Sequence, residues 1–190
     1  TELNLVLRYS VNGFDEMDKL AKNSTLIDSP TYKYLKAIND IKNYTLENKD
    51  ILIDTIYKHR LTREQIPTWG LADKDVLISL LTNIDKTEIT MPMTALLRNL
   101  GNMTSYGVFD DSMILSLLIK YMSNISIINS TKIHPVTVLT SWFTYRNGKG
   151  IKGHNTWIPN TMIVKALEEM FYLSFKNIEP TGKRICFLID

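Results

Sequence analysis

Apolar residues recur every three or four positions along most of the chain, which is the spacing of one face of an α-helix. In residues 160–176, Ile163, Leu167 and Met170 share such a face, and charged residues surround it. Gly101 follows one such segment and is expected to end its helix. The same pattern predicts further helices over residues 14–22, 31–38, 40–59, 74–81, 92–100, 111–122 and 135–145.

Strand-like alternation is almost absent, and no predicted helix is long enough for a coiled coil. Each helix has one apolar stripe to bury, so stacked pairs of helices are the simplest architecture. We therefore expect an all-α fold, a solenoid of helical repeats of the HEAT type. Periodicity alone leaves an irregular helical bundle open, because no repeat of fixed length is visible.

The helical pattern ends at the Pro-x-Gly turn of residues 179–182. Residues 185–189 are then consecutively apolar and are followed by Asp190. Such a run predicts a short buried β-strand with a carboxylate at its C-terminal edge, where open α/β sheets place ligand sites. We divide the chain into a helical domain, residues 1–178, and a junction with the first strand of a second domain, residues 179–190.

The composition is that of a globular protein, with 44% hydrophobic and 22% charged residues. No apolar run approaches the roughly 20 residues of a membrane span, so we expect no membrane partner. The single cysteine, Cys186, excludes an intrachain disulfide and a cysteine-based zinc site. It favours a reducing, intracellular setting, which we take to be the cytoplasm.

Charge is distributed unevenly, although the net charge is only +2. Residues 1–88 contain 12 Lys and Arg against 14 Asp and Glu, whereas residues 89–190 contain 10 against 6. No acidic residue lies between Asp111 and Glu168. A basic stretch of this length can attract a polyanion such as RNA, although a solvated protein face is the simpler interpretation.

Nothing in the sequence indicates catalysis or a cofactor. His59, His134 and His154 have no second His, Cys or carboxylate at the spacing of metal ligands, so we expect no metal site. A P-loop and a nucleophile elbow are both missing from the sequence. We therefore expect a protein that is not an enzyme.

Two clusters have residues suited to binding RNA. Arg60 and Arg63 follow the end of a predicted helix, where they can contact phosphate or complement the helix dipole. In residues 94–104, Arg98 offers a charged fork for phosphate and Asn99 a donor and acceptor for a base edge. The alternative for Arg98 is an ion pair with a carboxylate that holds adjacent repeats together.

A third cluster is the glycine-rich loop of residues 144–157. Recognition of single-stranded RNA uses positive charge, an approachable main chain and flat rings for stacking. The loop offers all three, with phosphate contacts expected from Arg146, Lys149 and Lys152 and stacking from Tyr145. The alternative is a polar connection in which Trp157 packs under the next helix.

These clusters carry a resemblance to the TROVE family, the Ro autoantigens. Residues 94–104, TALLRNLGNMT, are similar to its strongest motif, and residues 144–157 resemble its loop T-Y-x-x-G-x-G-x-x-G-x-x-x-W. The segments 59–64 and 133–135 also match, and residues 179–184 resemble the junction before a von Willebrand A-type domain. The resemblance runs in order through essentially the whole chain.

The resemblance implies a fold and a function. Family members form a closed ring of HEAT-like helices, of which this chain is the C-terminal half. They bind small structured Y RNAs on the outer surface and thread single-stranded 3′ ends of misfolded non-coding RNAs through a positively charged hole. The resemblance further suggests exoribonuclease partners. Asp190 matches only the first position of the metal-binding D-x-S-x-S motif of the A domain, so this chain holds no complete metal site.

The chain departs from the family at Glu16 and Met17, where vertebrate members carry His and Lys on the Y RNA surface. A carboxylate facing phosphate is repulsive, and each lost phosphate contact weakens binding. The resemblance therefore does not extend to the Y RNA contact that vertebrate members make.

From these observations we predict an RNA-binding module of a Ro-type ribonucleoprotein, active in the stability or quality control of small non-coding RNA. The alternative is an α-solenoid scaffold that binds protein and no RNA. Binding that weakens steeply with salt indicates RNA, whereas an apolar protein interface depends little on salt.

Overall fold

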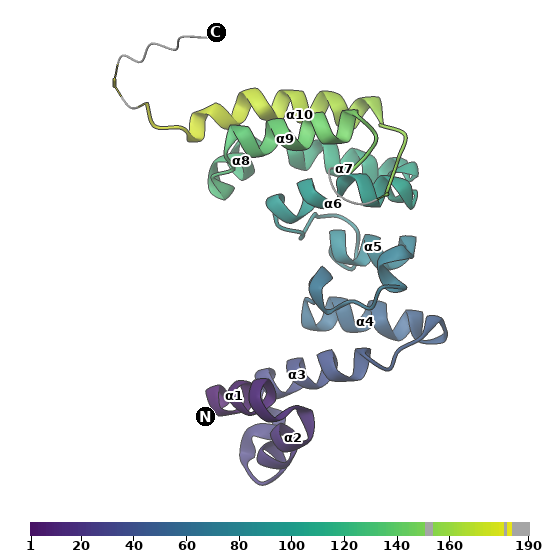
Figure 1. Cartoon of the computed structure of the whole chain (residues 1–190), viewed down its shortest axis with the longest axis vertical. Coiled ribbons are helices and arrows are strands. Elements are labelled where there is room, and N and C mark those ends of the chain that lie inside the picture. The colour runs from purple at the N-terminus through teal and green to yellow at the C-terminus, as the bar shows by residue number, and fades with distance from the viewer. Residues whose placement is uncertain (151–153, 181, 184–190) are drawn as a thin grey trace. The chain divides into compact units, whose positions relative to one another are not determined.

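The computed structural model describes residues 1–150, 154–180, 182 and 183, and it divides the chain into two compact units, Thr1–Thr90 and Met91–Asp190. Each unit is described by itself. The predicted all-α fold is confirmed, because the described residues form helices joined by turns (Figure 1). Their only β-type pairings are two isolated bridges, Thr82 with Ile89 and Lys149 with Thr156.

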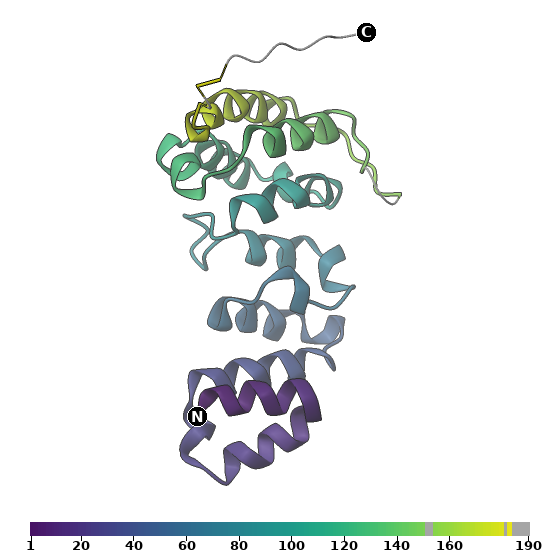
Figure 2. The ribbon, with the colours of Figure 1, turned by 60° about the vertical axis from the view of Figure 1, so that its left-hand side comes forward.

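The first unit is a series of five α-helices with four short 3₁₀ turns between them. α1 packs against both α2 and α3 (Figure 2). Leu5 of α1, Met17 of α2 and Leu35 of α3 form a shared core. The helices are α1 (Glu2–Asn12), α2 (Phe14–Lys22), α3 (Pro30–Ile41), α4 (Lys49–His59) and α5 (Lys74–Leu81), and the turns are Thr25–Asp28, Leu46–Asn48, Arg63–Gln65 and Gly70–Ala72.

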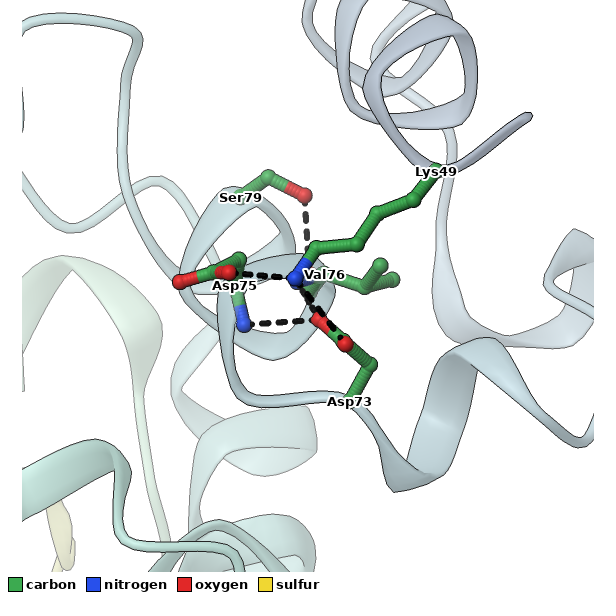
Figure 3. Close-up of polar contacts among 5 residues, drawn as sticks. All are labelled: Lys49, Asp73, Asp75, Val76 and Ser79. Atoms are coloured by element: carbon green, nitrogen blue, oxygen red, sulfur yellow. Dashed lines mark hydrogen bonds and ion pairs between the residues drawn. The ribbon is translucent and has the colours of Figure 1, made fainter. Parts of the chain in front are cut away.

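α5 begins at an aspartate that also contacts α4. Asp73 accepts hydrogen bonds from the backbone N–H groups of Asp75 (2.9 Å) and Val76 (3.1 Å), which otherwise have no partner in the first turn of a helix. Figure 3 shows Lys49 of α4 reaching both Asp73 (3.0 Å) and Asp75. The two carboxylates raise the pKa of Lys49, and Lys49 lowers the pKa of Asp75.

The described residues of the second unit form five α-helices, and α9 and α10 lie side by side in both views (Figures 1 and 2). The two helices run antiparallel. Tyr145 at the end of α9 meets Asn160 at the start of α10, and Asn177 after α10 donates to the carbonyls of Ile128 and Ile133 before α9. The helices are α6 (Met93–Ser105), α7 (Ser112–Met122), α8 (Ile125–Thr131), α9 (Pro135–Arg146) and α10 (Thr161–Ser174).

Two expected helix boundaries are wrong. The helix expected over residues 40–59 is two helices, because α3 ends at Ile41 and the polar turn before α4 has its own hydrogen bonds. In that turn Asn48 accepts from the backbone N–H of Thr45, which competes with helix formation. Gly101 does not end α6, which continues to Ser105.

Two helices were missed by the periodicity. α1 exposes Leu3, Leu7 and Val11 along one face, so its pattern does not separate an apolar from a polar side. α8 is only seven residues long and contains Ser, Asn and Thr, which have low helix propensity.

The strand and second domain expected over residues 179–190 stay predictions, because residues 181 and 184–190 lie outside the described residues. In the described part, no single helix is long and apolar enough to cross a membrane. The pair α7 and α8, bent by 64°, meets that test together by length and composition.

Candidate nucleic-acid interface

α6 presents Arg98 to solvent but not its neighbour Asn99. The Arg98 side chain is exposed and makes no ion pair with a described residue, so the expected alternative of a carboxylate partner finds no support. Asn99 is only 7% exposed, and its Nδ2 donates to the carbonyl of Ala95 at 2.7 Å. The expected contact of Asn99 with a base edge conflicts with this placement, because the amide lies inside the unit and bonds its own helix.

The loop between α9 and α10 begins with a turn that requires glycine. Gly148 has a φ of +67°, and a Cβ there would lie 2.6 Å from the carbonyl oxygen of Trp157. Trp157 donates its backbone N–H to Gly148 at 2.9 Å, and Gly150 donates to Asn155 at 3.2 Å. With the bridge between Lys149 and Thr156, these bonds form a short antiparallel stem at the base of the loop.

Three contacts join this loop and the end of α9 to α6. The Trp157 ring lies on Gly101, where an added Cβ would be 2.5 Å from ring carbons Cζ3 and Cη2. The Nδ2 of Asn155 donates to the Oδ1 of Asn102 at 3.2 Å. The Tyr145 hydroxyl lies 3.0 Å from the Thr104 hydroxyl. We call Gly101, Asn102, Tyr145, Asn155 and Trp157 the loop anchor.

Tyr145 belongs to this anchor and is not available for stacking on RNA. It is 2% exposed, its ring stacks on Trp157 at 6.0 Å, and its hydroxyl accepts from the backbone N–H of Asn160. Burial raises the pKa of the Tyr145 hydroxyl. The stacking role expected for Tyr145 therefore conflicts with the structure, because the faces of its ring are inside the unit.

Trp157 packs as expected, but its partners are α6 and Tyr145 of α9, both of which precede it in the chain. Its Nε1 also donates to the carbonyl of Tyr145 at 2.9 Å. Sequence reasoning missed the anchor as a unit. The signal that could have found it is Gly101 itself, since a glycine inside an otherwise helical pattern indicates a close approach by another group.

The anchor brings two of the predicted clusters together. Arg98 lies one helical turn before Gly101 and Asn102, on the face of α6 that receives the loop. Arg146 and Lys149 lie beside the same anchor, since Arg146 follows Tyr145 and Lys149 is bridged to Thr156, the residue before Trp157. Both are exposed and make no ion pair with any described residue. Lys152, the third cation expected here, lies outside the described residues.

Several lysines of the first unit, unlike the cations of the anchor region, are paired with carboxylates. Lys19, Lys22 and Lys36 each have a carboxylate within 2.8 Å on their own helix, and Lys49 has the two described above. Paired cations attract phosphate less, because the neighbouring carboxylate cancels their field. The unpaired cations of the anchor region are therefore better candidates for binding a polyanion than these four lysines.

The remaining predicted cluster lies in the first unit. Arg60 and Arg63 are both exposed, and Arg60 ends α4 in the left-handed backbone region with a φ of 50°. Burial and the nearby Lys58 lower the pKa of His59, which favours the neutral imidazole. Both arginines are thus accessible to a ligand, whereas His59 adds little positive charge.

Glu16 and Met17, at which the sequence predicts a departure from the family, both make contacts within the first unit. Met17 is fully buried in the core of the first unit. The Glu16 carboxylate pairs with Lys19 at 2.7 Å, and this hydrogen bond lowers the pKa of Glu16. Met17 is therefore not accessible to a ligand, and Lys19 partly balances the charge of Glu16.

Part of the chain is similar to known proteins. Residues 57–143 match the TROVE domain. Over 103 residues the chain is 41% identical to the RNA-binding protein RO60 of Caenorhabditis elegans, and over 103 residues 36% identical to that of Deinococcus radiodurans. Over residues 57–143 the chain is similar to the TROVE family. The TROVE match contains Arg60, Arg63 and all of α6, and it ends before Tyr145.

A solved relative extends the likeness beyond these segments. The crystal structure of the Deinococcus radiodurans RO (RSR) protein matches 95% of this chain with a TM-score of 0.75 and 28% sequence identity. The chain is much shorter than its relatives. The matched segments are 54% and 53% of this chain but 16% and 19% of the two RO60 proteins, and the chain covers 33% of the solved one.

Proposed function

We propose that this chain binds RNA through the anchored loop and the adjoining face of α6. The observation that carries the proposal is that Arg98, Arg146 and Lys149 lie around one anchor, are exposed and make no ion pair with any residue that the structure describes. Cations of this kind neutralise phosphates and release bound counterions, which supplies most of the affinity in RNA binding that is independent of sequence. Its role is binding and not catalysis.

The relatives support the same class of ligand, since both are named RNA-binding proteins. We further propose which RNA is bound: a small structured non-coding RNA of the Y type or the single-stranded 3′ end of a misfolded RNA. The chain then acts as one part of a Ro-type ribonucleoprotein in RNA stability or quality control. A closed ring, exoribonuclease partners and a cytoplasmic location stay predictions.

The proposal is tested by removing the loop cations. The variant R146Q/K149Q/K152Q is compared with K22Q/K33Q/K74Q, which makes the same change in net charge on the first unit. We expect the loop variant to weaken binding of a labelled oligouridylate by roughly tenfold or more, since each phosphate contact contributes separately. The control is expected to change affinity less than threefold, an effect of net charge alone. Equal effects of the two variants would contradict the assignment of the site.

A protein-interaction scaffold remains the second candidate, and one observation favours it. Leu3, Leu7 and Val11 lie four residues apart on α1 and are all exposed. A stripe of this kind is typical of a helix face that packs on another helix. Binding of a protein there, with no salt-dependent binding of RNA, is the result that would favour this function.

A further inference from the structure

The loop anchor depends on a fit between one glycine and one indole ring. Gly101 lies inside α6, where alanine is the better helix former. Its missing side chain leaves the space that the Trp157 ring occupies, since an added Cβ would lie 2.5 Å from two ring carbons. A side chain at position 101 must therefore displace Trp157, and with it the second half of the loop.

Trp157 also holds the end of α9. The carbonyl of Tyr145 is among the last four of that helix, which lack partners within the helix. It accepts from the Nε1 of Trp157 at 2.9 Å and from the backbone N–H of Gly148 at 3.1 Å. One side chain thus fixes the point where the helix ends and the loop begins.

The cations of the site lie directly beside these bonds. Arg146 follows Tyr145, and Lys149 pairs with Thr156, the residue before Trp157. Arg98 precedes Gly101 by one turn of α6. The contacts of Trp157 therefore hold the backbone of Arg146 and Lys149 against α6, the helix that carries Arg98, although Trp157 itself is partly buried and carries no charge.

We propose that Trp157 is a positioning residue for RNA binding. By holding the base of the loop against Gly101 and Tyr145, it fixes Arg146 and Lys149 relative to Arg98 before RNA arrives. A loop that is already ordered loses less conformational freedom on binding, so its contacts yield more affinity. This inference rests on the proposed function and assigns the role of one further residue in the same site.

A double-mutant cycle on the full chain tests the inference, with a labelled oligouridylate as the probe. The variants are W157L, R146Q/K149Q and the combination of both. If Trp157 acts through the two cations, W157L weakens binding about tenfold alone and has no further effect once the cations are gone. W157L is also expected to reduce the magnitude of the slope of log K against log salt by about 1.4, since each single-strand phosphate contact contributes about 0.7.

Two further variants separate positioning from folding. W157F keeps a flat ring over Gly101 and is expected to restore most of the affinity. N155A removes only the bond from Asn155 to Asn102 and leaves the ring in place, with N129A as a control at an exposed asparagine of α8. We expect N155A to weaken binding two- to threefold, of the size of one lost exposed hydrogen bond, and N129A to have no effect. Circular dichroism of each variant checks the helices.

The outcomes distinguish this inference from the function on which it rests. Additive effects of W157L and R146Q/K149Q would overturn the positioning role and leave RNA binding in place. If W157L loses its helical signal, the N155A variant tests the positioning role instead. An RNA affinity of N155A equal to that of the unaltered chain would then overturn that role. If the unaltered chain shows no salt-dependent binding of the oligouridylate, the proposed function fails and the role of Trp157 fails with it.

Discussion

At the scale of single residues, Arg60, Lys86 and Lys132 share an unusual backbone conformation. Each has a positive φ, and they are the only residues other than glycine to do so in the part of the chain that the structure describes. Such a conformation costs a side chain of this kind about 1–3 kcal/mol. Glycine avoids that strain at a cost of about 0.5–1 kcal/mol in chain entropy. Glycine is therefore expected to be the more stable residue at each of the three positions.

Arg60→Gly tests this argument. We expect the free energy of unfolding to rise by about 0.5–1 kcal/mol, because the relieved strain exceeds the entropy cost of glycine. We expect RNA affinity to fall, because the sequence predicts a phosphate contact at Arg60. Urea denaturation and a binding titration measure the two effects.

Arg63→Gly is the matched control, since Arg63 begins the turn Arg63–Gln65 without a positive φ. It removes the same charge and is expected to give no gain in stability. A gain equal to that of Arg60→Gly would show that strain at position 60 is not the cause.

At the scale of elements, several helices begin at a side chain that accepts backbone N–H groups. Asp73, Asp111, Asn124 and Asn160 do so for α5, α7, α8 and α10. These residue types are preferred at helix starts, which is why α5 and α7 were predicted to within one residue of their beginnings. The start of α4 could not be predicted in this way, since Asn48 makes no side-chain cap for that helix.

Variants of Asp73 and Asp75 distinguish the contribution of helix capping to stability from that of ion pairing. Both residues contact Lys49, but only Asp73 caps α5 (Figure 3). We expect Asp73→Ala to lower the free energy of unfolding by about 1–2 kcal/mol, mostly through the lost cap. Asp75→Ala is expected to cost less than about 1 kcal/mol, because it removes only an exposed ion pair. Urea denaturation measures both. Equal losses would mean that the ion pair, and not the cap, determines the stability of this helix start.

At the scale of the whole molecule, the helical fold could be predicted because amphipathic spacing and capping residues lie close together in the sequence. The loop anchor could not be predicted, because Gly101 and Trp157 are 56 positions apart and the periodicity of apolar residues gives no information about contacts between distant segments. The same limit explains Asn99 and Tyr145, which were expected to face RNA. Their polar groups have partners inside the second unit, and a polar residue with an internal partner looks in sequence like one that faces a ligand.

Arg98, Arg146 and Lys149 could be predicted to be exposed, since Lys and Arg are rarely fully buried. Their gathering around one anchor could not, because it depends on how α6 receives the loop. The sequence therefore identified the type of chemistry, and the structure adds which of the candidate residues share a surface.

The most direct test of RNA binding by this surface is a salt titration with a small structured RNA that carries a single-stranded 3′ tail, beside the same RNA without the tail. We expect the tailed RNA to bind more tightly, with log K falling linearly with log salt, and a smaller slope for R146Q/K149Q/K152Q. Binding that is insensitive to salt, or a slope unchanged in that variant, would contradict the account.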